Sequence, residues 1–111
     1  MPHQKYTDCI EACNACVVAC NHCAASCLKE PDVKMMARCI ALDIDCAQIC
    51  ALAAAFMARG SDHAQAICAL CADNCQACGD ECARHDMAHC QACAKACLAC
   101  AKSCRTMAAT A

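Results

Sequence analysis

Residues 9–27 decide the fold, and they read CIEACNACVVACNHCAASC. The six cysteines of this segment follow one another at intervals of 4, 3, 4, 3 and 4 positions. This alternation returns to one face of an α-helix about every 3.5 residues. The segment therefore predicts a helix with a continuous stripe of thiols along one side.

The same stripe occurs three more times along the chain. Shifting the cysteines of 13–27 by 55 positions reproduces every cysteine of 68–82, and a further shift of 22 positions reproduces those of 90–104. The segment between them fits the pattern with three cysteines, and Met36 and Asp43 occupy its two other positions. Together the four stripes contain all nineteen cysteines: Cys9, Cys13, Cys16, Cys20, Cys23, Cys27, Cys39, Cys46, Cys50, Cys68, Cys71, Cys75, Cys78, Cys82, Cys90, Cys93, Cys97, Cys100 and Cys104.

Helix-breaking residues separate the four stripes. Pro31 cannot continue a helix, Gly60 suits a helix C-terminus, and Asp62 with Gln65 has the spacing of a capping box. Asp86 is the expected N-cap of the last helix. We expect helices near residues 4–29, 32–59, 62–84 and 86–106. Short connections favour antiparallel neighbours, so the chain 1–111 is predicted to be one all-α domain, an up-down-up-down four-helix bundle with a cysteine-lined core.

Composition excludes several classes of protein. A net charge of −2 gives no basic surface for nucleic acid, and a hydrophobic fraction of 61% argues against disorder. The odd number of cysteines, with only two Gly and two Pro, argues against a disulfide scaffold. Residues 1–9 contain no apolar stretch of signal-peptide length, and no segment has about 20 uncharged apolar residues. We therefore expect a cytoplasmic protein with no membrane partner.

The stripes favour metal binding over other uses of cysteine. Buried cysteine can act as a small hydrophobic side chain, but nineteen on four matched stripes exceed that use. A dithiol redox or sensor protein needs one activated pair, and no Cys-x-x-Cys pair here stands out. Iron–sulfur clusters usually draw their ligands from loops rather than from stripes on helices. A metallothionein-like zinc or soft-metal buffer remains the main alternative.

Charge balance favours Cu(I) among the metals. A zinc site with four thiolates carries a formal charge of −2, so several such sites would bury a large negative charge. Each Cu(I) ion replaces one thiol proton, and this soft ion prefers thiolate and thioether ligands. Thiolates that bridge neighbouring ions can hold roughly one Cu(I) per cysteine. The sequence therefore predicts multiple Cu(I) ions per chain.

The chain resembles the copper storage protein family of bacteria from Cys9 to Cys104. The resemblance implies a four-helix bundle that stores and sequesters Cu(I) in the cytoplasm, has no enzymatic activity, and assembles as a homo-oligomer, a tetramer in this family. Its copper donors and acceptors are unknown. The resemblance implies that the nineteen cysteines are metal ligands, and that the other ligands include Met36, Asp43 and His85.

The register of the stripes predicts two different ends of the bundle. Met36 and His85 lie at one end, which we call the histidine end, with Met87 and His89 as further candidates for the site where metal enters. The side chain of His89 is otherwise expected at the solvated surface, as is that of His22. The opposite end, which we call the terminal end, is predicted to be an apolar plug that includes Met57 and Met107, together with Tyr6 and Phe56. Asp43 is expected midway between the two ends, level with Cys20, Cys75 and Cys97.

Overall fold

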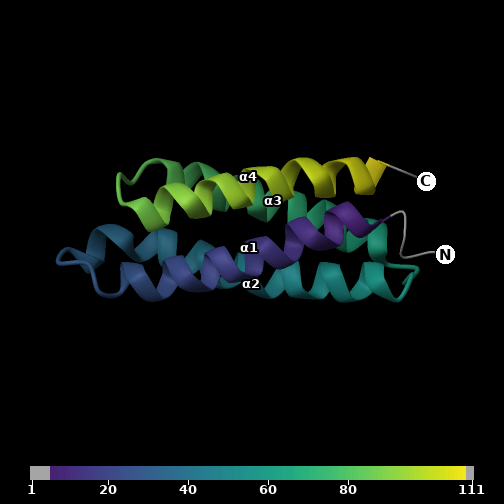
Figure 1. Ribbon diagram of the computed structural model, residues 1–111, viewed down its shortest axis with the longest axis horizontal. Helices are drawn as coiled ribbons and strands as arrows, with labels where there is room; N and C mark the ends of the chain where they lie inside the picture. The colour runs from purple at the N-terminus through teal and green to yellow at the C-terminus, as the bar shows by residue number, and fades with distance from the viewer. Residues whose placement is uncertain (1–5, 110–111) are drawn as a thin grey trace.

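Four α-helices make up the computed structural model of the protein, which describes residues 6–109 (Figure 1). They are α1 (Thr7–Cys27), α2 (Ala37–Ala58), α3 (Ala64–Ala83) and α4 (Ala88–Ala109). A short 3₁₀ helix, η2 (Val33–Met36), leads directly into α2. Residues 6–109 contain no β-strand.

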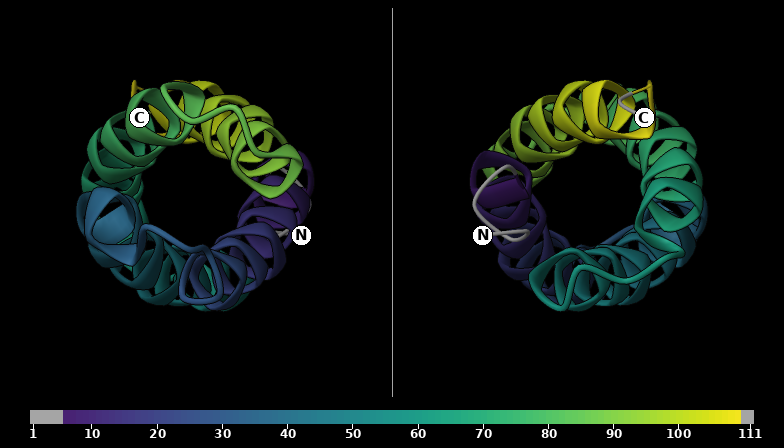
Figure 2. Two further views of the ribbon diagram at one scale, coloured as in Figure 1. Left: turned by 90° about the vertical axis from the view of Figure 1, so that its left-hand side faces the viewer. Right: turned by 90° about the vertical axis from the view of Figure 1, so that its right-hand side faces the viewer.

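The helices form an elongated antiparallel bundle with extents of 48 × 18 × 18 Å. Each helix packs against its two neighbours, α1 against α2 and α4, and α3 against α2 and α4. Seen from either end, the four helices surround a central axis (Figure 2). The chain enters α1 and leaves α4 at the same end of the bundle, which is the terminal end (Figure 1). The predicted all-α four-helix bundle is confirmed.

The helix boundaries follow the predicted breakers with some corrections. Gly60 has φ 65°, and the amide groups of Gly60 and Ser61 donate to the carbonyls of Met57 and Phe56, so α2 ends as predicted in a glycine-dependent motif. The predicted capping box at Asp62 is wrong. His63 is the N-cap of α3 without a side-chain cap, and its amide donates to Ser61 Oγ at 3.1 Å.

The first and last helices also begin later than predicted. Tyr6 is the N-cap of α1, so this helix starts at Thr7 rather than at residue 4. Residues 4 and 5 themselves lie outside the described part of the chain. The Met87 carbonyl accepts the first helical hydrogen bonds of α4, which places Asp86 one residue before the N-cap.

Most side chains in the core are small, and many of the bulky aliphatic ones are exposed. The nineteen cysteines are buried together with alanines such as Ala53 and Ala101, whereas Val18, Leu52 and Leu70 are at least half exposed. Small groups let the helices approach closely. A Cβ atom added at Gly79 of α3 would lie 2.8 Å from Leu98 Cγ of α4. The core of the bundle therefore consists mainly of cysteine side chains rather than of large aliphatic side chains.

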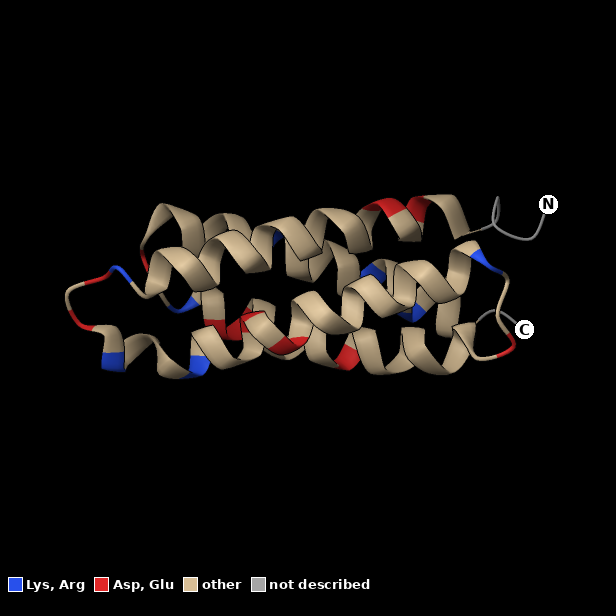
Figure 3. Ribbon diagram, turned by 90° about the horizontal axis from the view of Figure 1, so that it is seen from below, with Lys and Arg blue, Asp and Glu red and all other residues tan. Residues whose placement is uncertain are grey.

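Charged residues are spread over all four helices and their connections (Figure 3). One segment, Val33–Ala58, is long and apolar enough to cross a membrane by length and composition, with a mean hydropathy of 1.8. A single such helix is weak evidence, because the core helix of a bundle passes the same test. In this structure the buried residues of the segment include Met36, Asp43 and three cysteines.

Candidate metal centre

The nineteen cysteines form one array of thiols along the bundle axis. All are free and buried. Neighbouring sulfur atoms lie from 3.3 Å apart, as in Cys39–Cys82, to 4.0 Å apart, as in Cys46–Cys97. Contacts join sulfurs four residues apart on one helix as well as sulfurs on facing helices. The array therefore offers adjacent sulfur pairs to metal ions along the bundle.

Sets of four sulfurs from three helices converge at successive levels of the bundle. Within each set, the sulfur atoms all lie within 4.8 Å of one another. Four of these sets, in order from the terminal end to the histidine end, are Cys13/Cys71/Cys100/Cys104, Cys16/Cys46/Cys50/Cys75, Cys20/Cys78/Cys93/Cys97 and Cys23/Cys27/Cys39/Cys90. Each set is a group of sulfur ligands that could hold a metal ion.

The register of α3 differs from the one predicted by the repeat. α1 and α2 pair as expected, with Cys16 and Cys46 sulfurs 3.5 Å apart. The repeat paired Cys39 with Cys78, but the structure places Cys39 beside Cys82 at 3.3 Å. This difference is one stripe position, about 6 Å along a helix that rises about 1.5 Å per residue. The cysteine spacing carries no information about this register.

Asp43 lies among four thiols and is fully buried. Cys78 and Cys93 donate to its Oδ1 atom at 3.2 and 3.3 Å, Cys82 donates to the same atom at 3.5 Å, and Cys39 donates to Oδ2 at 3.8 Å. Burial raises the pKa of Asp43 to about 8, because the apolar surroundings disfavour the charged carboxylate. The predicted level beside Cys75 and Cys97 is therefore wrong, because the α3 and α4 thiols that contact Asp43 lie one stripe position nearer the histidine end. The predicted pairing of α1 with α2, which places Cys20 level with Asp43, is kept.

Two histidines lie at the histidine end, and their surroundings differ. His89 Nδ1 faces three thiols, at 3.5 Å from Cys23, 3.5 Å from Cys90 and 3.9 Å from Cys27. Its Nε2 is buried without a hydrogen bond and lies 3.7 Å from Glu30. The expectation of a solvated surface position is wrong for His89, whose side chain is only 15% exposed. For His22 it is confirmed, because that residue is exposed.

His85 points its Nε2 atom at a carboxylate. The distance from His85 Nε2 to Glu81 Oε2 is 2.9 Å, and both side chains are buried. Glu81 also pairs with Arg38 at 3.6 Å and with Arg84 at 3.5 Å. Sequence reasoning overlooked Glu81, although its spacing of four residues from His85 on a helix was a visible signal.

The methionines at this end also differ in exposure. Met36 is fully buried and belongs to the same core cluster as the cysteines, as expected for a residue in a stripe position. Met87 is half-buried and packs against that cluster.

Burial raises the pKa of Cys27 and of Cys90 above the ordinary thiol value, so these thiols keep their protons in the absence of metal. A metal ion that binds here displaces those protons.

A bundle whose axis is filled with free, mutually contacting thiols defines a class of protein, the thiolate metal-binding helical bundles. Comparison with known proteins gives the family. The copper storage protein (Csp) family matches residues 2–109, and the chain belongs to this family. A relative in Bacillus subtilis (strain 168), the uncharacterized cysteine-rich protein YhjQ, is 55% identical over 107 residues, which are 96% of this chain and 99% of that protein.

Two solved structures are similar over nearly their whole length. The Cu(I)-bound copper storage protein BsCsp3 is 56% identical with a TM-score of 0.90, over 94% of this chain and 98% of that chain. A cytosolic copper storage protein from Streptomyces lividans, loaded with five coppers, is 40% identical with a TM-score of 0.93, over 99% and 97% of the two chains. Multiple copper ions are therefore bound in proteins with this fold.

Proposed function

We propose that the protein stores and sequesters many Cu(I) ions in the cytoplasm, bound by the thiols that line its axis, and that it is not an enzyme. The observation that carries this proposal is the array itself, nineteen buried free thiols, most of which lie 3.3–4.0 Å from another sulfur. Membership of the copper storage protein family supports it. The cytosolic Streptomyces lividans relative supports the location.

Charge, rather than distance, selects the metal. The edge of a tetrahedral zinc site with Zn–S bonds of about 2.3 Å is close to 3.8 Å, which the sulfur separations also match. Several zinc sites of charge −2 would, however, lie in a core where Asp43 already keeps a raised pKa because it is buried. Cu(I) replaces thiol protons one for one and leaves the core near neutral. The zinc-buffer alternative is therefore disfavoured.

The proposed ligands are the nineteen cysteines with Met36, Asp43 and His85, and with Met87 and His89 at the histidine end. The contacts of His89 Nδ1 with three thiols support His89 as a metal ligand more strongly than the sequence did. His85 must release Glu81 before its Nε2 atom can bind a metal ion. Asp43 reaches thiols from α2, α3 and α4, which suits a ligand shared among neighbouring copper ions.

We further propose that the chain forms a homotetramer. Large apolar side chains on the outer faces of α2 and α3, including Ile44, Leu52 and Leu70, are 47–52% exposed and are available to such an assembly. The proposal includes no nucleic-acid or membrane partner and assigns no copper donor or acceptor. Light scattering of the purified protein measures the mass, and a monomer at micromolar concentration would contradict this part of the proposal.

Anaerobic titration of the fully reduced protein with Cu(I), in competition with a chromophoric Cu(I) chelator, tests the storage function. We expect a capacity of roughly one copper per cysteine, since each ion replaces one thiol proton. A parallel zinc titration serves as the comparison. Saturation at one or two coppers, together with tight binding of zinc at about a quarter of the cysteine count, would support the zinc buffer instead.

The two histidines are expected to differ in their effect on copper uptake. His89→Ala removes a nitrogen that faces three thiols, so uptake of the first copper ions should slow about tenfold, in line with the loss of one metal ligand contact. His85→Ala removes a partner of Glu81 and should slow copper uptake less than His89→Ala does. Stopped-flow absorbance of the growing copper–thiolate bands gives both rates. An equal effect of the two substitutions would contradict the assignment.

A further inference from the structure

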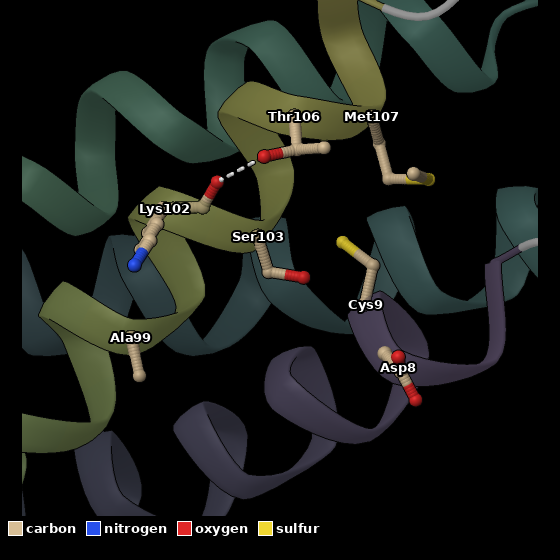
Figure 4. A pocket seen from close by; sticks show the side chains of 7 residues that line it. All are labelled: Asp8, Cys9, Ala99, Lys102, Ser103, Thr106 and Met107. Atoms are coloured by element: carbon tan, nitrogen blue, oxygen red, sulfur yellow. Dashed lines mark hydrogen bonds between the residues drawn. The ribbon is translucent and has the colours of Figure 1, made fainter.

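Near the terminal end, where Tyr6, Met57 and Met107 pack in or against the core as predicted, the surface of the bundle has a pocket. A pocket of about 320 Å³ lies between α1 and α4. Asp8 and Cys9 of α1 form one wall, and α4 contributes the other residues: Ala99, Lys102, Ser103, Thr106 and Met107 (Figure 4). Met107 lines this pocket and also packs against the core, while Met57 of α2 is fully buried.

Cys9 connects this pocket to the core. It is buried like the other cysteines, with a relative exposure of 1% against 0% for the rest, but it is the cysteine that lines the pocket. Its sulfur and the sulfur of Met107 lie on opposite sides of the gap, and the Ser103 hydroxyl also points toward it (Figure 4). A thiol and a thioether from two helices are the donor types that Cu(I) prefers.

A chain of sulfur contacts leads from Cys9 into the array. Cys9 Sγ lies 3.6 Å from Cys104 Sγ, which lies 3.7 Å from Cys13 and 3.8 Å from Cys100. Cys13, Cys100 and Cys104 belong to the first set of four thiols at this end. An ion that binds Cys9 therefore finds another sulfur ligand close to the previous one at each move into the bundle.

We propose that this pocket is a second exchange site for Cu(I), at which Cys9 and Met107 accept ions from small thiol carriers and return ions to them. The proposal rests on the storage function. The pocket volume, about 320 Å³, is of the size that holds a small molecule, and the exposed charges of Asp8 and Lys102 at its wall suit a carrier with both an amino and a carboxyl group.

The transfer is a ligand exchange without electron transfer. Copper arrives bound to two carrier thiolates. The Cys9 sulfur forms a bond to copper, one carrier thiolate leaves, and the proton of the Cys9 thiol passes to that departing thiolate. Copper stays in the +1 state, and the thioether of Met107 supports it during the exchange. Copper then moves to Cys104 as the second carrier thiolate leaves and takes the proton of the Cys104 thiol.

Exchange kinetics test the site in protein whose histidine end is weakened by His89→Ala. In this background, Met107→Leu should slow uptake of Cu(I) from its glutathione complex about tenfold, because leucine keeps the shape but lacks the thioether sulfur. Met57→Leu is the matched control, a methionine at the same end that does not line the pocket. An unchanged rate for Met107→Leu, or equal slowing by both substitutions, would overturn the proposal.

A copper-free measurement separates this proposal from the storage function. Brief alkylation of the reduced metal-free protein with iodoacetamide, followed by peptide mass mapping, should modify Cys9 ahead of all other cysteines. Ser103→Phe, which fills the pocket, should suppress that modification about tenfold while the helical circular dichroism is unchanged. Earlier modification of Cys27 or Cys90 would show that the terminal end is closed. A low copper capacity in the Cu(I) titration would contradict the storage function but would leave the result for Cys9 accessibility unchanged.

Discussion

Loading the metal-free protein with Cu(I) is expected to raise the midpoint of its thermal unfolding by about 30 °C or more. The largest fully buried side chains are Met36, Met57 and Asp43, so the metal-free core contains few large apolar groups. A ligand that binds only the native state at 1,000 times its Kd adds about 4 kcal/mol per site. Each kcal/mol moves the midpoint of a domain of this size by about 4–8 °C. Two such sites suffice for the expected shift.

Anaerobic circular dichroism at 222 nm, recorded at zero, half and full copper loading, measures this shift. The reasoning depends on thiols that are brought together by the fold, as in the sets of four within 4.8 Å. A flexible metallothionein-like chain would bind copper equally well when unfolded, and its midpoint would hardly move. A shift of only a few degrees at full loading would therefore contradict a preformed array. Loading with zinc provides the comparison.

The helices could be predicted from the sequence because the cysteine period is regular. Alternating intervals of 3 and 4 residues place every thiol on one face, and the four stripes require four helices. Gly60 ended α2 as predicted because only a residue that tolerates a positive φ suits that position. The prediction that Asp62 caps α3 was wrong because a capping motif depends on local backbone geometry. Here that geometry lets Ser61, rather than Asp62, accept the hydrogen bond from the His63 amide.

The contacts between helices could not be predicted to the same detail. A repeat fixes which residues face the axis but not how far one helix slides along the next. For this reason the predicted level of Asp43 relative to α3 and α4 was wrong by one stripe position. The two histidines illustrate the same limit. His85 continues the stripe of α3 in the sequence, but Glu81 holds its Nε2 atom, and His89 reaches the thiols from the first turn of α4.

Asp43→Asn is expected to remove a pH dependence of stability from the metal-free protein. The pKa of Asp43 is about 8 in the folded protein, against an ordinary value of 3.8. Between these values the native state keeps a proton that the unfolded chain loses. The native state therefore binds more protons, and the free energy of unfolding falls as the pH rises. The expected slope is about 1.4 kcal/mol per pH unit, or on the order of 3 kcal/mol between pH 5 and pH 7.

Anaerobic urea unfolding at several pH values from 5 to 7 measures this difference. The asparagine variant lacks the titrating group but keeps a side-chain oxygen that can accept hydrogen bonds from Cys78 and Cys93. The free energy of unfolding of this variant, relative to that of the unsubstituted protein, should increase as the pH rises. Asp45→Asn is the matched control, since Asp45 is an exposed carboxylate on the same helix. Parallel pH profiles for the unsubstituted protein and Asp43→Asn would mean that Asp43 is already ionised in the folded protein. The thiols around it would then hold a buried negative charge before any copper binds.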